Sequence, residues 1–243
     1  MNFTMNTSQL TSDDLSGILL VDKPPRMTSH DVVYRLRRAL NISRIGHAGT
    51  LDPLATGLLI MLIGRATKYS QFLTGMDKSY RGTMKFGEIT DSYDSDGNIL
   101  EARPVHDLSL NKLQTIADEF LGTSEQIPPM FSAKKMHGRP LYKLARKGHI
   151  VERLPVTINI SHFAIESLSS NFADFFVHCS KGTYVRSLVH EFGEKLGCGA
   201  HLSALRRCSV GPFSLSSAIS LEQACTSDIR GYLIDLSTLG IAK

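Results

Sequence analysis

Residues 44–57 constrain this chain more than any other stretch, because they join two glycines, a histidine and an Asp-Pro pair directly to an apolar run. They read Arg-Ile-Gly-His-Ala-Gly-Thr-Leu-Asp-Pro-Leu-Ala-Thr-Gly, and residues 58–63 follow as a continuous apolar segment typical of a buried strand. Pro53 disfavours the α region for Asp52 and removes the next backbone donor. The backbone, rather than a helix face, therefore sets the direction of this carboxylate.

The residues alone leave two interpretations of Asp52 open. A loop that carries Gly, His and Asp beside a rigid strand is a common place for catalytic groups. An aspartate in a tight turn more commonly caps backbone N–H groups. Capping is the commoner role in general, and the catalytic role needs further support.

The length, charge and cysteines of the chain limit the class of protein. Its 243 residues allow one large domain, or one domain with a small appendage, and can bury about three quarters of the unfolded surface. The net charge of +4 permits a polyanionic partner without requiring one. The four cysteines form no C-x-x-C pair, and no histidine spacing completes a zinc site. We therefore expect reduced thiols in a cytoplasmic protein.

The start of the chain is polar and rich in Ser, Thr and Asn. It lacks the basic and apolar regions of a signal peptide, so we expect a disordered leader over residues 1–16. The longest apolar run in the chain is far too short to span a membrane.

Hydrophobic periodicity predicts strands and helices without a regular βαβ rhythm, which indicates an α+β fold. Short apolar or alternating runs predict strands at residues 17–24, 58–63, 79–86, 156–160, 163–167 and 172–179. Helices are expected after Thr28 or Ser29, over residues 66–73 and 109–121, and after residue 183. The buried faces are predicted to hold Val32, Val33, Leu36 and Leu40; Tyr80, Met84 and Phe86; Leu110, Leu113, Ile116, Ala117 and Phe120; and Val185, Leu188, Val189 and Phe192.

Residues 90–97 form an acidic, turn-rich segment with the sequence Thr-Asp-Ser-Tyr-Asp-Ser-Asp-Gly. The spacing of its acidic residues superficially resembles a calcium-binding loop. The tyrosine within it, the lack of a closing glutamate and the missing flanking helices argue against calcium. The segment therefore predicts a turn and no metal site.

Residues 134–147 carry six lysines and arginines and no acidic residue, with His137 and Tyr142 between them. Basic residues that alternate with stacking side chains suit a folded RNA loop. A solvated helix face over residues 140–147 explains the same charges equally well.

The central stretch, Gly46-His-x-Gly-x-Leu-Asp-Pro-x-Ala-x-Gly57, resembles the active-site motif of the bacterial tRNA pseudouridine synthase B family, the TruB family. Further matches follow in the family's order between about residues 17 and 213. They are Asp22-Lys-Pro with Thr28-Ser29, Asp77-Lys-x-Tyr-Arg81, Thr90-Asp-x-x-Asp94, the basic stretch, Lys181-Gly-x-Tyr-x-Arg186 and Leu205. Arg26 departs from the pattern, because it stands where the family usually has glycine and an arginine is strained at positive φ.

The resemblance implies the pseudouridine synthase fold: a central, mostly antiparallel mixed sheet flanked by helices and loops. It implies a catalytic domain at residues 17–215, with a basic, thumb-like insertion at about 124–152. Residues 216–243 would then be a short tail, too short for the further RNA-binding domain that many bacterial members carry.

The activity implied by the resemblance is isomerisation of uridine to pseudouridine in the TΨC loop of tRNA, at position 55. The uridine must leave the stacked loop, the N1–C1′ bond must break, and C5 must join C1′. No redox change occurs and no group leaves, so neither a cofactor nor a metal is expected. The expected partner is the tRNA T-arm, and the protein is expected to be a monomer.

The resemblance assigns the central chemistry to Asp52, as a carboxylate that either attacks C1′ or acts as a base on the sugar. Arg186 would keep this carboxylate ionised, because burial alone would raise its pKa. His47 would fill the space that the flipped base leaves, or brace the loop. Asp94 is a weaker site candidate.

The resemblance also assigns residues to the base and to the RNA backbone. Tyr80 would stack on the flipped base and can relay the C5 proton, while Tyr184 and Leu205 would line the pocket. Without the resemblance, all three would be interpreted as core residues. The expected RNA contacts are Lys134, Lys135, Arg139, Lys143, Lys181 and Arg206, with Arg207 also near phosphate.

Two other functions compete with this interpretation. A non-catalytic RNA chaperone could keep the fold, although Asp52, Tyr80 and Arg186 are all present. A carboxylate-dependent hydrolase of nucleosides or sugars usually needs a second catalytic carboxylate, for which Asp94 and Glu88 are the nearest options by motif. Release of free uracil would support the hydrolase.

Overall fold

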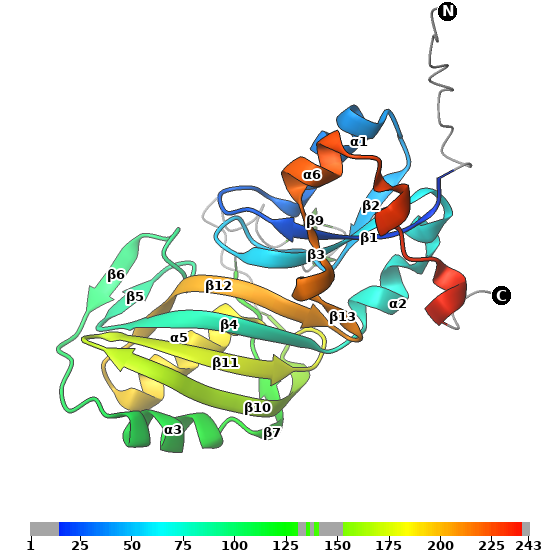
Figure 1. Cartoon of the computed structure of the whole chain (residues 1–243). Helices are drawn as coiled ribbons and strands as arrows, with labels where there is room; N and C mark the ends of the chain where they lie inside the picture. The colour runs from blue at the N-terminus through cyan, green and yellow to red at the C-terminus, as the bar shows by residue number, and fades with distance from the viewer. Residues whose placement is uncertain (1–14, 131–134, 137–138, 141–152, 240–243) are drawn as a thin grey trace, which may run out of the picture. The chain divides into compact units, whose positions relative to one another are not determined.

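The computed structural model of the chain describes residues 15–130, 135–136, 139–140 and 153–239 (Figure 1). These residues belong to two compact units. The first unit contains residues 15–53, 57–74 and 213–239, so it is assembled from both ends of the described chain. The second contains residues 54–56 and the described part of 75–212.

The first unit is built on a small sheet of mostly antiparallel strands. β1 (Gly17–Lys23) and β2 (Ile45–Ala48) each pair antiparallel with β3 (Thr56–Ile63), and β14 (Ile219–Ser220) pairs parallel with β1. The strands predicted at 17–24 and 58–63 are confirmed. Every side chain from 58 to 63 is fully buried, which explains why this run lacks the alternation of a half-buried strand.

Helix α1 (Ser29–Leu40) of the first unit begins at a capping box, in which Thr28 and Asp31 each bind the other's backbone N–H. The side chains that it buries are Ser29, Val32, Val33 and Leu36. The helix predicted at 66–73 is present as two segments, the 3₁₀ turn η1 (Gly64–Tyr69) and α2 (Ser70–Thr74). Both sequence-based predictions of helical structure are therefore confirmed.

The segment after residue 212 is folded into the first unit. It contains β13 (Phe213–Ser214), η2 (Leu215–Ser217), α6 (Leu221–Thr226), η3 (Ile229–Tyr232) and η4 (Leu236–Leu239). Helix α6 packs against α1 and β1. Ile234 exchanges two backbone hydrogen bonds with Ile18, each 2.9 Å long. The two ends of the described chain thus share one core.

The second unit is built on an antiparallel sheet in the order β12, β4, β11, β10, β7 (Figure 1). The strands span Ala200–Val210, Lys78–Phe86, Phe172–Cys179, Val156–Ser169 and Gly122–Gln126, respectively. Two short antiparallel pairs accompany it, β5 (Glu88–Thr90) with β6 (Ile99–Ala102), and β8 (Lys135–Met136) with β9 (Arg139–Pro140). The predicted α+β class with mostly antiparallel strands is confirmed.

Two helices pack against one face of this sheet, α3 (Leu110–Asp118) and α5 (Val185–Leu196). The ring of Phe192 on α5 contacts the rings of Phe86, Phe120 and Phe163. The side chains of β4 predicted to share a buried face are buried: Tyr80, Met84 and Phe86. The predicted α5 core positions are also buried: Val185, Leu188, Val189 and Phe192.

Two local predictions in the second unit are wrong. The strands predicted at 156–160 and 163–167 are one continuous strand, β10, because register shifts near Ser161 and Glu166 absorb the extra residues without ending it. Leu110, predicted to face inward, is 46% exposed at the first turn of α3. The helical period places Leu110 on the buried stripe, but the core begins only one turn later, at Leu113.

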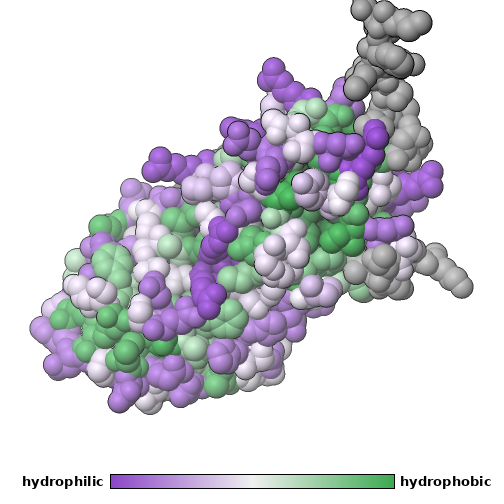
Figure 2. All heavy atoms as spheres, in the orientation of Figure 1, coloured by the Kyte–Doolittle hydropathy of each residue, from purple (hydrophilic) through white to green (hydrophobic). Residues whose placement is uncertain are grey.

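The surface of the second unit carries an apolar area on β6. Ile99 and Leu100 are 59% and 68% exposed, and Figure 2 shows green residues where β6 lies in Figure 1. Elsewhere on this face hydrophilic and hydrophobic residues are mixed (Figure 2). Within the described ranges, no helix is both long and apolar enough to cross a membrane.

Candidate active site

The loop that carries Asp52 is held at Leu51, the residue before it, by the buried hydroxyl of Ser29. The Oγ of Ser29, which is 1% exposed, accepts a hydrogen bond from Leu51 N at 2.9 Å and lies 3.1 Å from Leu51 O, to which it donates. Ser29 is the first residue of α1, so a rigid helix end fixes both polar groups of the Leu51 backbone. The peptide that leads into Asp52 therefore cannot rotate freely.

The residue after Asp52 is held by the turn that follows β1. The backbone N–H of Arg26 donates to Pro53 O at 2.9 Å, and the Nζ of Lys23 lies 3.5 Å from the same oxygen. Lys23 is fully buried, and its ammonium also donates to Pro24 O at 2.9 Å and Met27 O at 2.6 Å. The half-exposed Asp52 thus stands between two anchored residues.

The turn after β1 keeps a glycine-like conformation although it contains an arginine. Arg26 has φ 59°, the left-handed region that glycine occupies without strain. The strain expected from the sequence at this position is therefore present, and the turn is retained.

His47 lies in β2, opposite Met61 of β3, and is half-buried. Its carbonyl oxygen accepts a hydrogen bond from Ser70 Oγ at 3.3 Å, which ties β2 to the start of α2. Gly49, between His47 and Asp52, has φ 80°. A glycine is needed there because the chain leaves β2 through a left-handed residue.

Beyond Pro53 the chain enters the second unit, where Thr56 fixes its other end. The Oγ1 of Thr56 donates to Leu205 O at 3.3 Å and accepts from Arg206 Nη1 at 3.3 Å. Leu205 and Arg206 belong to β12. The residue four positions after Asp52 is therefore bonded to the strand that carries the predicted base-lining leucine.

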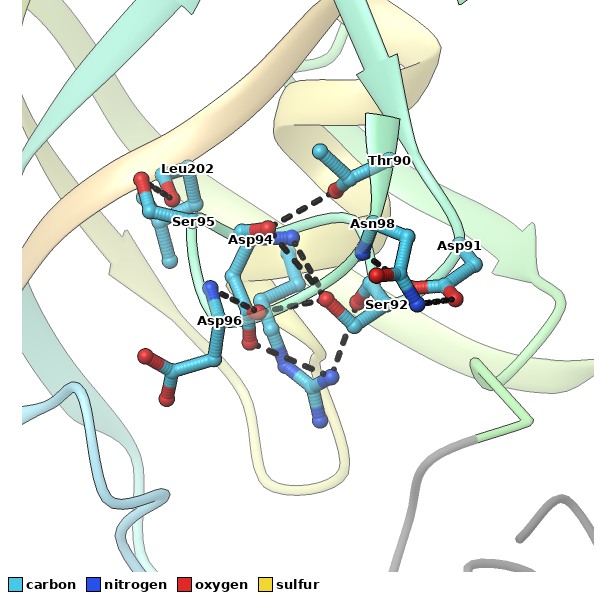
Figure 3. Close-up of polar contacts among 9 residues, drawn as sticks. Thr90, Asp91, Ser92, Asp94, Ser95, Asp96, Asn98 and Leu202 are labelled. Atoms are coloured by element: carbon cyan, nitrogen blue, oxygen red, sulfur yellow. Dashed lines mark hydrogen bonds and ion pairs between the residues drawn. The ribbon is translucent and has the colours of Figure 1, made fainter. Parts of the chain in front are cut away.

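In the second unit, Arg186 and Asp94 form a buried ion pair (Figure 3). The Nη1 of Arg186 lies 3.5 Å from Asp94 Oδ2 and donates to Ser92 O at 2.9 Å. Both side chains are 5% exposed. A buried pair of this kind contributes little net stability, but removing one partner costs several kcal/mol because it strands the other charge. The position of the guanidinium is therefore strictly defined.

The loop around Asp94 is a dense network of short-range hydrogen bonds (Figure 3). Asp94 accepts hydrogen bonds from the Ser92 hydroxyl and from Asp96 N, and the Thr90 hydroxyl donates to Asp94 O at 2.8 Å. Ser95 N donates to Leu202 O at 3.0 Å, which attaches the loop to β12. Burial and the charge of Asp94 raise the pKa of Asp96. The loop presents a fixed carboxylate to Arg186.

The entry to α5 is held by a buried glutamine. Gln126 Oε1 accepts from Tyr184 N at 2.7 Å, and its Nε2 donates to Tyr184 O at 3.2 Å. Gln126 is 2% exposed and ends β7. Tyr184 is the N-cap residue of α5, two residues before Arg186, so Gln126 positions the helix end that carries both predicted site residues.

Tyr80 and Leu205 lie on one face of adjacent strands. Leu205 of β12 stands opposite Gly82 of β4, and Arg207 stands opposite Tyr80. A Cβ on Gly82 would come within 2.6 Å of the Phe175 ring and 2.9 Å of Ala204 O, so this position has room only for glycine. Tyr80 is 7% exposed, and Leu205 is half-buried.

The two described arginines that were expected at phosphate differ in exposure. Arg206 is exposed, whereas Arg207 is 1% exposed and hydrogen-bonds the hydroxyl of Tyr80. Burial lowers the pKa of Arg207, and the nearby Tyr80 oxygen opposes that change. The expectation that Arg207 contacts phosphate does not fit its burial, because neighbouring residues on an antiparallel strand face opposite sides of the sheet.

The remaining predicted RNA contacts are only partly described. Lys181 is exposed at the turn between β11 and α5, next to Gly182 with φ 83°. Lys135 and Arg139 lie in β8 and β9, without described side chains. Lys134 and Lys143 lie outside the described residues.

Some contacts that organise this region were not predicted from the sequence. Gln126 as the anchor of Tyr184, Ser29 as the anchor of Leu51 and Arg207 as the partner of Tyr80 all depend on pairings between residues far apart in the chain. The only available signal was that Ser29 and Gln126 fall within stretches that match the family.

Comparison with known proteins identifies the relationship of the whole chain. Residues 37–185 match the model for the TruB family pseudouridylate synthase N-terminal domain, and residues 186–227 match the tRNA pseudouridylate synthase B C-terminal domain. The tRNA pseudouridine synthase B of Opitutus terrae is 53% identical over 209 residues, 86% of this chain and 87% of that protein. That of Stutzerimonas stutzeri is 46% identical over 86% of this chain and 68% of that protein.

Solved structures agree with this relationship. A Cbf5-Nop10-Gar1 complex contains a chain that is 31% identical, with a TM-score of 0.68 over 85% of this chain. An H/ACA ribonucleoprotein bound to a substrate RNA containing 2′-deoxyuridine gives 29% identity and a TM-score of 0.63. The present chain spans about half the length of these solved chains, 53% and 51%. On the matches to both family models and the identity to the curated relatives, this chain belongs to the TruB family of pseudouridylate synthases, which are isomerases.

Proposed function

We propose that this protein converts uridine to pseudouridine at position 55, in the T loop of tRNA, and that Asp52 carries the chemistry. The observation that supports this most is the anchoring of Asp52 on both sides, through Leu51 by Ser29 and through Pro53 by Arg26 and Lys23. A carboxylate that must reach a single sugar carbon benefits from such anchoring, since small displacements cost large factors in rate. The named relatives are tRNA pseudouridine synthases.

The proposed reaction begins when the uridine leaves the stacked loop, at a cost of a few kcal/mol. The N1–C1′ bond then breaks with the participation of the Asp52 carboxylate, which either attacks C1′ or removes a proton from the sugar. The base turns, C5 joins C1′, and the C5 proton is lost while N1 gains one. Atoms and electrons balance without an oxidant, reductant or second substrate.

The second unit is proposed to handle the uracil base. Tyr80 would stack on the flipped base, and Leu205 and Tyr184 would border it. The buried contacts of Arg186 with Asp94 and Ser92 keep its guanidinium in one position. A group that balances negative charge in the reaction must be fixed in this way. His47 would fill the space that the base vacates.

The exposed Lys181 and Arg206 are proposed to bind the phosphates of the T-arm. Each Lys or Arg that neutralises a phosphate releases counterions, so its loss should weaken binding to any sequence alike. Replacing either residue with Ala should reduce the slope of log affinity against log salt by about 1. Unchanged salt dependence in both variants would remove these residues from the interface.

The decisive experiment measures tritium release from a T-arm stem-loop labelled at C5 of the target uridine. Wild type should release tritium, and Asp52→Asn should release at least about a thousandfold less while binding the RNA with unchanged affinity. Asp118→Asn, which changes an exposed carboxylate at the end of α3, is the matched control and should behave as wild type.

The same samples distinguish the competing functions. Wild-type binding without tritium release, on the stem-loop and on full-length tRNA, would indicate an RNA chaperone. Release of free uracil instead of pseudouridine would indicate a hydrolase. Equal activity of Asp52→Asn and wild type would refute the role of Asp52.

A further inference from the structure

Arg207 is a cation in the interior of the second unit, directly opposite Tyr80. It is 1% exposed and is the largest side chain in this protein among those described as fully buried. The pairing of β12 with β4 sets Arg207 opposite Tyr80 and Arg206 opposite Arg81. Because successive side chains on a strand alternate, Arg207 shares the buried face with Tyr80, and its guanidinium hydrogen-bonds the phenolic hydroxyl.

The register of β12 around Arg207 is set by two irregularities. One lies between Leu202 and Ala204 and the other between Arg207 and Ser209, so the intervening segment pairs regularly with residues 80–83. Bulges re-aim side chains and are common beside functional sites. Without the second bulge, the residues after Arg207 would point to the other face. The regular pairing between the two irregularities places Leu205 and Arg207 on the face of Tyr80.

Lys78 is a second buried cation that acts on Arg207. Lys78 lies two residues before Tyr80 on the same face of β4 and interacts electrostatically with Arg207, with Cys179 of β11, with Asp77 and with Lys181. Burial, followed by the charge of Arg207, lowers the pKa of Lys78 to about 8. A guanidinium keeps its charge in such surroundings far more readily than an ammonium does. Arg207 is therefore a permanent cation beside the Tyr80 oxygen.

We propose that Arg207 is a positioning residue that holds the Tyr80 hydroxyl and stabilises its phenolate, so that Tyr80 accepts the C5 proton in the last step of the isomerisation. The proposal rests on the proposed function, because it needs a uracil base against Tyr80. A charge-assisted hydrogen bond to the ionised oxygen is about twice as strong as a neutral one, and burial increases the difference.

The C5 proton leaves in one step that balances in atoms and electrons. After C5 has joined C1′, C5 still carries its hydrogen and the N1–C6 bond is double. The phenolate oxygen of Tyr80 takes the C5 proton, and the C–H electron pair becomes the C5–C6 double bond. The former N1–C6 π pair moves to N1, which takes a proton from solvent. The Tyr80 phenol then returns its proton to solvent, with Arg207 again stabilising the phenolate.

The test compares Arg207→Met, which removes the charge, with Arg207→Lys, which keeps a cation. Arg81→Met is the matched control, because Arg81 lies beside Tyr80 but is exposed and bonded to Glu166 on the opposite face. Arg207→Met should bind the T-arm stem-loop within about twofold of wild type and turn over about a hundredfold more slowly. Arg207→Lys should recover most of the rate, and Arg81→Met should match wild type.

Two measurements separate this role from a merely structural one. The rising limb of the rate against pH should move to higher pH in Arg207→Met, because the phenolate then forms only at higher pH. A stem-loop with deuterium at C5 of the target uridine should show a larger isotope effect in Arg207→Met than in wild type, because loss of the C5 proton becomes limiting. An unmoved pH profile or an unchanged isotope effect overturns the proposal.

A double-substitution cycle keeps the proposal testable even if Arg207→Met is less stable. In a Tyr80→Phe background, adding Arg207→Met or Arg207→Lys should cause no further loss of rate. A further loss equal to that in wild type means that Arg207 acts independently of Tyr80 and overturns the proposal. If wild type itself releases no tritium from labelled RNA, the proposed function fails, and this inference fails with it; wild-type release with full additivity refutes only the role of Arg207.

Discussion

The Asp52 loop of the first unit and the α5 entry region of the second unit hold their functional groups by different means. Around Asp52, the side chains of Ser29 and Lys23 bind backbone atoms of Leu51 and Pro53. In the second unit, buried charges bind other side chains, as Arg186 does with Asp94 and Arg207 does with Tyr80.

The difference teaches that the two kinds of functional group need different control. A short carboxylate such as Asp52 is directed mainly by the path of its backbone, so fixing the neighbouring peptides fixes the carboxylate. A long side chain such as Arg186 has many rotamers, and only partners at its far end define where its charge lies. Substitutions in the two regions should therefore have different signatures.

The largest effect is expected where a buried charge loses its partner. Arg186→Met should lower the free energy of unfolding by about 3–5 kcal/mol, because Asp94 then remains buried without its guanidinium. The double variant Arg186→Met/Asp94→Leu should recover most of that stability, although not activity. Denaturant titration measures both. If Arg186→Met is as stable as wild type, the Arg186–Asp94 pair does not contribute to the stability of the second unit.

A smaller effect on stability, but a clear effect on rate, is expected for Ser29→Ala. Removing the hydroxyl deletes its hydrogen bonds with the buried N–H and C=O of Leu51. The free energy of unfolding should fall by about 1–3 kcal/mol. Turnover should fall by up to about a hundredfold through displacement of Asp52, with RNA affinity unchanged. Ser161→Ala, on an exposed part of β10, is the control. Equal turnover in Ser29→Ala and wild type would contradict backbone control of Asp52.

A third effect should depend on pH, because the second unit contains the buried amine of Lys78, which interacts with Arg207. Burial lowers the pKa of Lys78 to about 8, from 10.5 in an unfolded chain. Between these values the unfolded chain binds a proton that the folded chain lacks, so stability should rise with pH by at most about 1.4 kcal/mol per unit.

The window from pH 8 to 9 isolates this effect. Burial raises the pKa of Cys179 to about 11 from 9.0, so above pH 9 the unfolded chain loses the thiol proton first, and this contribution offsets the rise from Lys78. Lys78→Met should therefore remove a rise in the unfolding free energy between pH 8 and 9, as chemical denaturation at each pH would measure. An identical pH dependence in both proteins would exclude Lys78 as its source.

The smallest effect is expected for Arg26→Gly. Arg26 has φ 59°, where a side chain costs roughly 1–2 kcal/mol, while glycine loses more entropy on folding, roughly 0.5–1 kcal/mol. The net gain in the free energy of unfolding should be about 1 kcal/mol or less, seen as a small rise in the thermal midpoint. Tyr34→Gly, at an exposed position within α1, should lower the thermal midpoint instead. A lower midpoint for Arg26→Gly would show that the arginine side chain makes compensating contacts.

The elements that could be predicted from the sequence are those whose hydrophobic pattern lies within one short stretch of the chain. The buried run at 58–63, the capped helix at 29–40 and the face shared by Tyr80, Met84 and Phe86 all follow from local patterns. The continuity of β10 could not be predicted, because a bulge has no residue signature in a stretch without Gly or Pro.

Within the candidate site, the motifs indicated individual candidate residues but not the residues that these contact. Arg186 meets Asp94 across 92 positions of sequence, and Arg207 meets Tyr80 across 127. Both contacts depend on strand register and loop path. Register is set by the whole pattern of burial on a sheet, and a local period cannot supply it. Because the register of β12 could not be predicted, Arg207 was expected to contact phosphate instead of Tyr80.

The order in which a ribosome releases the chain bears on the first unit. The described part of residues 75–212 makes up most of the second unit, so that unit can fold while synthesis continues. Strand β1 cannot complete its backbone pairing until Ile219 and Ile234 have emerged to pair with Val21 and Ile18. The Asp52 loop, although made early, therefore depends on residues made much later, and a chain that stops before residue 219 should contain a folded second unit and an incomplete Asp52 loop.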